Sequence, residues 1–381
     1  MILFLLDLFD VEGKHLLLRM AGAALLSFLL VIALGPRMIR YLLRRKIGDR
    51  PEFDHADLND LTRHKSNTPT MGGALIVIAI MASILVFGDV FGPNGNMYVR
   101  MSLLALVWLG ALGGIDDWLK LNKAAGKSSR DGLKSWEKML FQLGLAVLLG
   151  LYTYRYGSQS DIDGTNPAHN LYIPFWAGYI VLSQLAYTVI TVLTMVGFSN
   201  AVNLTDGMDG LAGGCVIIVT FVLLVLAELV GVVSYSQLFN LPLVYGSVEM
   251  TIVCTSMIGA CLGFLWYNAH PAQVFMGDTG SLPLGGLIGY TAVVTRQELL
   301  LLIAGGVFIM EAGSVMLQVG YFKMTRPAKG MKGRKIFRCA PLHHHFHLGG
   351  WAETKVVTRF WLLGIVFAAL ALASLKLRLG G

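Results

Sequence analysis

Apolar runs about as long as a lipid bilayer is thick recur along this chain, and they restrict its fold more than any other feature. A helix that crosses the hydrocarbon layer needs about 20 apolar residues. The candidate spans are residues 16–43, 71–90, 97–119, 136–155, 174–197, 210–233, 248–267, 280–295, 299–322 and 355–376. The pattern predicts an all-α polytopic membrane protein with about ten transmembrane helices.

Composition supports the same class and excludes others. Of the 381 residues, 55% are hydrophobic and only 14% are charged, which leaves too few polar side chains to cover a soluble protein of this size. The 30 Lys and Arg residues outnumber the 23 Asp and Glu residues, but they lie in loops and form no nucleic-acid-binding face. We therefore expect one transmembrane domain over residues 1–381.

Two of the runs leave the number of spans open. Residues 280–295 are short for a span and rich in glycine. Merging them with a neighbour, or splitting the run at 299–322, would change the count.

The distribution of basic residues predicts the orientation in the membrane. Lys and Arg concentrate in the first, third and ninth connections, whereas residues 91–96, 156–173 and 234–247 contain none. Short loops rich in Lys and Arg mark the cytoplasmic side. We expect the odd-numbered connections to lie in the cytoplasm and both termini to lie outside it.

Five polar clusters lie in or beside these same odd-numbered connections. They are "RHKSNTPTMGG" (63–73), "GGIDDWLK" (113–120), "SNAVNLTDGMDG" (199–210), "YNAHPAQVFMGDTGS" (267–281) and "CAPLHHHFH" (339–347). Their common side predicts one site at the cytoplasmic face, assembled from the whole chain.

The third apolar run ends on two adjacent carboxylates, Asp116 and Asp117. Carboxylates are unfavourable at membrane depth and at the C-terminal end of a helix dipole. A positive group should compensate them, and Lys120 or a divalent cation could do so. Because adjacent residues point in different directions, one carboxylate could meet a metal while the other faces substrate or lysine.

The segment "NLTDGMDG" places Asp206 and Asp209 three residues apart among glycines. If it is helical, both carboxylates lie on one face near a helix N-terminus, where anions are tolerated. A helix cap or a calcium-like D-x-x-D pattern is the plainer interpretation.

The segment "FMGDTGS" places Asp278 in a Gly-Asp-Thr-Gly turn before a short apolar run. Such glycines let the backbone approach a ligand, and a helix N-terminus can face a phosphate. Asn268 and Phe275 add an amide and an aromatic face. A simple turn is the alternative.

His343, His344 and His345 are adjacent, so a helix could not direct all three at one metal. An extended loop could direct alternate ones, which keeps zinc open, but "RKIFR" upstream favours imidazoles that face phosphate. Lys65 and "TPTMGG" add a cation and hydroxyl groups, although a capped helix start with proline gives the same pattern. Together, carboxylates, lysines and glycine turns on one face suit Mg²⁺ and a diphosphate.

The clusters occur in the order of a known family. With "TPTMGG", "DDWLK", "NAVNLTDGMDGLA", "FLWYNAHPAQVFMGDTGS" and "IFRCAPLHHHF", the chain from about Lys46 to Arg378 resembles the phospho-N-acetylmuramoyl-pentapeptide transferases. These belong to the polyprenyl-phosphate N-acetylhexosamine-1-phosphate transferases. The resemblance implies transfer of phospho-MurNAc-pentapeptide from its UDP carrier to undecaprenyl phosphate, giving lipid I and UMP in peptidoglycan synthesis. It also implies Mg²⁺, ten helices and a homodimer.

The resemblance assigns roles to residues at matching positions. Asp278 would be the principal magnesium ligand, with Asp116 and Asp117 close to the metal and the phosphates, and Asp116 resembles a proposed general base. Phe275 would stack on uracil. The rest of the nucleotide side would be Asn203, Leu204, Asp206, Asp209 and Asn268. The remaining polar site residues would be Lys65, Thr70, Lys120, Lys138, Asn200, Gly277, His343, His344 and His345.

Two positions depart from the family pattern. The loop "LNKAAGKSSRDGL" before Lys138 is longer than usual, and His347 stands where the family commonly has Glu. A role that needs that carboxylate would be lost or supplied elsewhere. The role of Asp116 also stays open: a lipid phosphate with a second pKa of about 6 is largely a dianion already. Asp116 could instead position the nucleophile, or hold Lys120 and the metal.

Two other functions compete with this one. A sister enzyme would use UDP-GlcNAc as its donor. An ion-coupled secondary transporter would also need intramembrane acids, but such acids usually lie near the bilayer midplane, between repeats. Here they lie at one face, and the chain shows no internal repeat.

Overall fold

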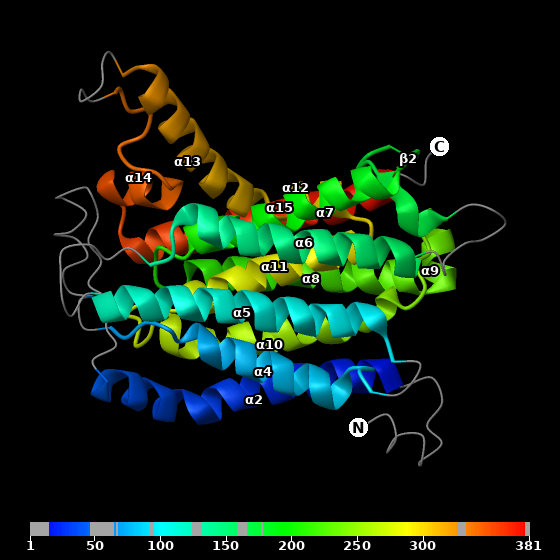
Figure 1. Ribbon diagram of the computed structural model, residues 1–381, viewed down its shortest axis with the longest axis horizontal. Coiled ribbons are helices and arrows are strands. Elements are labelled where there is room, and N and C mark those ends of the chain that lie inside the picture. The colour runs from blue at the N-terminus through cyan, green and yellow to red at the C-terminus, as the bar shows by residue number, and fades with distance from the viewer. Residues whose placement is uncertain are drawn as a thin grey trace.

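The computed structural model describes residues 15–45, 65, 68–91, 95–123, 132–157, 166–176, 178–326 and 333–377. Long helices lie side by side along most of the molecule (Figure 1). They are α2 (His15–Arg44), α4 (Gly73–Phe87), α5 (Met97–Lys123), α6 (Ser135–Gly157), α7 (Gln184–Thr205), α8 (Leu211–Gly231), α10 (Met250–Asn268), α11 (Asp278–Val294), α13 (Gly306–Met324) and α15 (Glu353–Leu377). The short helices are α9 (Val233–Leu238), α12 (Glu298–Ala304) and α14 (Leu342–Leu348), with 3-10 turns at Pro167–His169 and Ser247–Glu249.

Each of the ten predicted spans contains a helix, which confirms a mostly helical membrane protein. Among the described residues, six helices are long and apolar enough to cross a membrane, or seven if α12 and α13 are counted as one bent span. The helix α4 is apolar but short, at 15 residues.

The prediction for residues 174–197 was wrong at its start. Strands β1 (Asn170–Tyr172) and β2 (Tyr179–Val181) pair as an antiparallel hairpin, with Leu171 opposite Ile180. The helix α7 begins only after Ser183, whose side chain accepts a hydrogen bond from the backbone N–H of Ala186, a usual N-cap arrangement. This hairpin is also a small exception to the all-α prediction.

The run at 299–322 is split, which was one of the alternatives. The helices α12 and α13 meet at Gly305 with a bend of 85°. The side chain of Phe198 packs so closely that a Cβ on Gly305 would lie 2.5 Å from its ring. Beyond this bend, α13 leaves the bundle at an angle (Figure 1).

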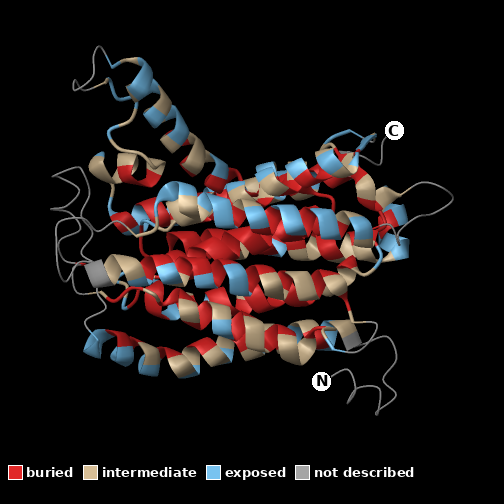
Figure 2. Cartoon of the chain, in the orientation of Figure 1, coloured by how far each residue is buried: buried red, intermediate tan, exposed pale blue. Residues whose placement is uncertain are grey.

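The most buried helix is α11, which packs against α5 and α7. All of its residues from Asp278 to Val294 are buried, as the red centre of Figure 2 shows. Small residues permit this packing: the backbone of α7 lies within 3 Å of the positions that a Cβ on Gly285 or Gly289 would occupy. The first residue of α11, Asp278, is therefore held in a rigid part of the protein.

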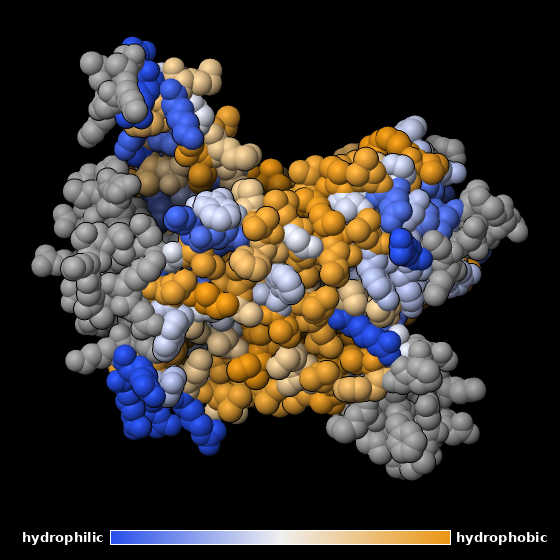
Figure 3. All heavy atoms as spheres, viewed as in Figure 1, coloured by the Kyte–Doolittle hydropathy of each residue, from blue (hydrophilic) through white to orange (hydrophobic). Residues whose placement is uncertain are grey.

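Large apolar side chains cover the outer helices, including Leu17, Leu185, Leu193 and Met316. On the face in Figure 3 they form a hydrophobic band, with hydrophilic residues toward its two ends. The helices α5, α7 and α10 end, and α6, α8, α11 and α15 begin, at the same end of the bundle, which we call the polar end (Figure 1, left). All five polar clusters of the sequence adjoin it.

Candidate active site

Three carboxylates meet at the polar end: Asp116 and Asp117 from α5, and Asp278 from the start of α11. One oxygen from each lies within 4.8 Å of the others, and all three side chains are buried. We call this group the aspartate triad. Such close negative charges repel strongly unless cations neutralise them.

Two lysines neutralise the triad. The Lys120 Nζ lies 2.8 Å from Asp116 Oδ2 and 3.2 Å from Asp278 Oδ2. The Lys138 Nζ, from the first turn of α6, lies 2.5 Å and 2.7 Å from the same two oxygens. The compensation predicted for Lys120 is confirmed, and the structure brings Lys138 to the site despite the long loop that precedes it.

The two adjacent aspartates do point in different directions. Asp117 accepts hydrogen bonds from the backbone N–H groups of Asp278 (3.2 Å) and Thr279 (2.9 Å), and from the Thr279 hydroxyl (2.7 Å). It therefore caps the N-terminus of α11, where the helix dipole favours a negative charge. Asp116 instead faces the lysines and accepts the backbone N–H of Leu133 at 2.7 Å.

Glycine allows α5 and α11 to meet. A Cβ on Gly113 would lie 2.1 Å from the Asp278 carbonyl oxygen. Gly277, just before α11, has a φ of 70°, and a Cβ there would lie 2.6 Å from an Asp117 oxygen. The glycines of "GGIDDWLK" and "FMGDTGS" therefore let the carboxylates approach each other.

The last turn of α7 completes this side of the site. Asn203 donates hydrogen bonds to Asp278 Oδ1 (2.7 Å) and to the Ser281 hydroxyl (2.9 Å). Burial, together with the nearby Asp278 and Asp117 carboxylates, raises the pKa of Asp206 well above its usual range. Leu204 is half-buried on the same turn. Asn200 lies apart from the triad and bonds Gln142.

A second group of charges, the Lys65 cluster, lies at the same end. Its Lys65 Nζ is 2.6 Å from Asp209 Oδ1 and 2.5 Å from Glu353 Oε1. The His270 Nδ1 lies 3.1 Å from Asp209 Oδ2. Sequence reasoning missed Glu353 and His270. The sequence did carry a signal for each of them. His270 lies in the polar segment at residues 267–281, and Glu353 lies just before the last apolar run.

The shared helical face predicted for Asp206 and Asp209 was conditional on a helix, and that condition is not met. Residues 206–210 form a turn between α7 and α8, so Asp206 lies toward the triad while Asp209 belongs to the Lys65 cluster. Asn268 holds this turn: it accepts the Gly210 N–H at 3.0 Å and donates to the Val274 carbonyl at 2.9 Å.

The segment "TPTMGG" is attached to the segment that carries Phe275 and Gly277. The Phe275 N–H donates to the Pro69 carbonyl, and the Gly72 N–H donates to the Phe275 carbonyl, both at 2.8 Å. The buried Thr70 lies beside Gly277. Lys65 is 5.9 Å from the ring centre of Phe275, within the range of a cation–π contact.

The histidines form the short helix α14, so the extended loop required for a zinc site is not present. His343 bonds Glu311, His345 accepts the Arg338 N–H at 3.0 Å, and the rings of His343 and His344 lie 4.1 Å apart. Burial lowers the pKa of His343 to about 3 and that of His344 to about 2, so both are neutral near pH 7. His347 bonds the carbonyl of Trp351 at 2.9 Å.

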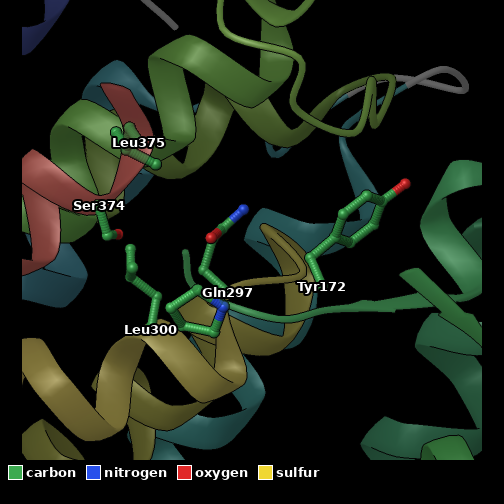
Figure 4. Close-up of a pocket in the computed structure, with 6 residues that line it drawn as sticks. Tyr172, Gln297, Leu300, Ser374 and Leu375 are labelled. Carbon is green, nitrogen blue, oxygen red and sulfur yellow. The ribbon is translucent and has the colours of Figure 1, made fainter. Parts of the chain in front are cut away.

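A hollow at the opposite end of the molecule has a different character. It encloses about 170 Å³, including open space at its mouth, between β1, the start of α12 and the end of α15 (Figure 4). Its lining is Tyr172, Pro174, Gln297, Leu300, Ser374 and Leu375. None of these described lining residues carries a charged side chain, in contrast to the polar end.

Comparison with known proteins agrees with the geometry of the polar end. A model of glycosyl transferase family 4 matches residues 99–296, which include the triad. A phospho-N-acetylmuramoyl-pentapeptide-transferase of Desulfotalea psychrophila (strain LSv54 / DSM 12343) is 43% identical over 365 residues, which cover 96% of this chain and 95% of that protein. The chain belongs to glycosyl transferase family 4.

A second family 4 relative extends the comparison. The phospho-N-acetylmuramoyl-pentapeptide-transferase of Methylacidiphilum infernorum (isolate V4) is 42% identical over 369 residues, with 96% of this chain and 95% of that protein covered. These matches confirm the resemblance drawn from the motifs. This family 4 member is a transferase and, with its span-length helices, a multi-pass membrane protein.

Proposed function

We propose that this protein transfers phospho-MurNAc-pentapeptide from UDP-MurNAc-pentapeptide to undecaprenyl phosphate, giving lipid I and releasing UMP. The observation that carries the proposal is the meeting of the aspartate triad, two lysines and the Lys65 cluster at one end of the bundle. Relatives that match almost the whole chain carry the name of this transferase. The reaction is a step of peptidoglycan biosynthesis.

The triad fits Mg²⁺, because closely spaced carboxylate oxygens are the ligands that this hard cation prefers. Asp278, Asp116 and Asp117 would hold it. When bound, the ion would neutralise charge that develops on the diphosphate. Lys120 and Lys138 would then bind phosphate oxygens, because their ammonium groups already lie where the triad and the phosphates would meet.

Asp116 has a positioning role in this proposal. Its Oδ1 accepts the Leu133 N–H, and its Oδ2 contacts both Lys120 and Lys138. The lipid phosphate is largely a dianion before it attacks, so a base would have little proton to remove. Asp116 would orient the two lysines on either side of the reacting phosphates.

The Lys65 cluster would bind the nucleotide. Phe275 offers a half-buried ring for uracil, next to the Lys65 ammonium. Asp209 and Asn268 fix the turn that faces this ring. Lipid substrate would reach the triad from the membrane, whereas the UDP donor would enter from the solvent at the polar end.

The sequence pattern supports placing the polar end in the cytoplasm, with ten spans and both termini outside. The family resemblance supports a homodimer in the inner membrane.

The deciding experiment measures UMP release by the purified protein in detergent with undecaprenyl phosphate and Mg²⁺. UDP-MurNAc-pentapeptide and UDP-GlcNAc are offered in parallel. Release with the muramoyl donor alone is expected. UMP release with UDP-GlcNAc alone would show that the protein has the sister activity. No UMP release with either donor would favour the ion-coupled transporter.

Replacement of Asp278 by Asn tests the metal role. We expect UMP release to fall at least about a hundredfold and Mg²⁺ to lose its effect on the remainder, because the triad loses a charge that the site needs. Asp89→Asn, at the far end of the bundle, is the matched control and should keep activity. Normal Mg²⁺ activation in the Asp278 variant would refute the assignment.

A further inference from the structure

Glu311 is a buried acid on the apolar helix α13, which together with α12 is long enough to form a bent span. It lies less than two turns after the 85° bend at Gly305, and its side chain is fully buried. An acidic side chain inside an apolar helix is unfavourable and usually has a functional partner.

The partner of Glu311 is His343 on α14. The Glu311 carboxylate accepts the His343 backbone N–H at 3.2 Å and faces the ring Nδ1 at 3.0 Å. When Glu311 is ionised, its carboxylate can only accept a hydrogen bond, and the imidazole proton then lies on Nδ1. The other ring nitrogen, Nε2, is left with a lone pair.

The Nε2 atom faces the turn that carries Asp206. It is buried and has no hydrogen-bond partner among the described residues, which is unusual for a polar atom. A Cβ on Gly207 would lie 2.3 Å from it, so only glycine allows this approach. Gly207 itself is exposed, and its main chain lies next to the fully buried His343 ring, so a ligand that bonds Nε2 must displace this turn.

We propose that Glu311 is a positioning residue that fixes the His343 tautomer and so presents Nε2 as a hydrogen-bond acceptor for the bound substrate. The matching group on the substrate is a donor, a hydroxyl or an amide N–H of the nucleotide or the sugar. This differs from the role expected from the sequence, in which imidazoles face phosphate, because a bare Nε2 cannot donate to a phosphate oxygen. The inference rests on the proposed transferase function.

The test uses four variants in the full-length protein: Glu311→Gln, Glu311→Ala, His343→Asn and the double variant Glu311→Ala/His343→Asn. The Asn amide can keep the contact with Glu311 but has no counterpart of Nε2. Ser314→Ala, which removes a hydroxyl bonded to the Glu311 backbone carbonyl, is the control on the same helix.

We expect Glu311→Ala and His343→Asn each to lower kcat/KM for the muramoyl donor about tenfold or more, as loss of an orienting partner typically does. Glu311→Gln should retain most activity, because its amide oxygen still accepts from Nδ1. The double variant should be no worse than His343→Asn. If the double variant instead loses the product of the two single-variant losses in kcat/KM, Glu311 has a merely structural role and the proposal is overturned.

A second readout does not depend on turnover. In ¹⁵N-histidine-labelled protein, the resonance lost in His343→Asn should show protonated Nδ1 and bare Nε2 at neutral pH, and an Nε2–H tautomer would overturn the inference. If the wild type releases no UMP, the proposed function fails, while this spectrum still decides the tautomer. Gel filtration and thermal unfolding confirm that each variant is folded.

Discussion

Lys120 and Lys138 place two ammonium groups against the oxygens that a divalent cation would use. Asp278 Oδ2, for example, lies 2.7 Å from the Lys138 Nζ. Metal binding must therefore displace or share these lysines, and a diphosphate would accept the contacts they give up. Metal and nucleotide should bind more tightly together than either does alone.

Replacement of Lys138 by Met tests this competition. A unit charge about 4 Å away contributes about 4 kcal/mol at an effective dielectric constant near 20, part of which solvent screens. We expect Mn²⁺ to bind the nucleotide-free variant about tenfold more tightly, measured by electron paramagnetic resonance, while UMP release falls. Lys134→Met, on an exposed neighbouring residue, is the control. Unchanged Mn²⁺ affinity would exclude competition.

The buried histidines make stability depend on pH. The pKa of His343 is about 3 in the folded protein, below its ordinary value of about 6.5, because burial disfavours the cation. The unfolded chain therefore binds the proton first, and stability decreases as pH falls from about 6.5 toward 3.

We expect the Tm in detergent to fall between pH 7 and pH 5, and to fall less in His343→Asn than in the wild type. His344 contributes the same kind of decrease to both proteins. Equal slopes would mean that His343 is not held neutral by burial.

At the residue scale, the sequence predicted most of the side chains that meet at the polar end but did not single out three of the residues that contact them. The aspartates stood out because carboxylates next to apolar runs need a partner. Glu311, His270 and Glu353 each sit singly in the sequence, and their partners are at least 32 residues away. No local pattern carries such pairings.

At the scale of elements, α5 and α11 determine the position of the triad. Their contact at Gly113 leaves no room for a Cβ, because the Asp278 carbonyl oxygen would be 2.1 Å away. The adjacent Gly114 has room, with its nearest neighbour at 3.8 Å.

The pair offers a matched test. Gly113→Ala should push α11 away from α5, destabilise the protein by about 1–3 kcal/mol and reduce UMP release. Gly114→Ala should be nearly neutral in both measurements. Similar behaviour of the two variants in thermal unfolding and turnover would contradict this account of the helix contact.

The sequence predicted an element well where the bounds of an apolar run and the bounds of a helix coincide. The predicted span at 174–197 started too early because the segment "YIPFWAGYIVL" (172–182) is apolar. Its two ends belong to the strands β1 and β2, which pair as a hairpin. The bend at Gly305 falls inside a long and mostly apolar run, so hydrophobicity alone does not locate it.

At the scale of the whole molecule, the polar end brings together helix ends from most of the chain.

Orientation in the membrane can be tested with single cysteines in a Cys339→Ser background, because the other three native cysteines are buried. Lys134→Cys lies at the polar end and Tyr179→Cys at the other, and both side chains are exposed.

A membrane-impermeant maleimide should label Lys134→Cys only in inside-out vesicles and Tyr179→Cys only in right-side-out vesicles. The reverse pattern would place the polar end outside the cytoplasm and would be incompatible with a cytoplasmic UDP donor.

The bond between Lys65 and Glu353 has a consequence for biogenesis. Lys65 precedes the second helix of the described bundle, and Glu353 begins the last one, 288 residues later. Before α15 is inserted, Lys65 and Asp209 lack their shared carboxylate partner. The Lys65 cluster is therefore complete only after the final helix has entered the bundle, so its assembly must follow synthesis of nearly the whole chain.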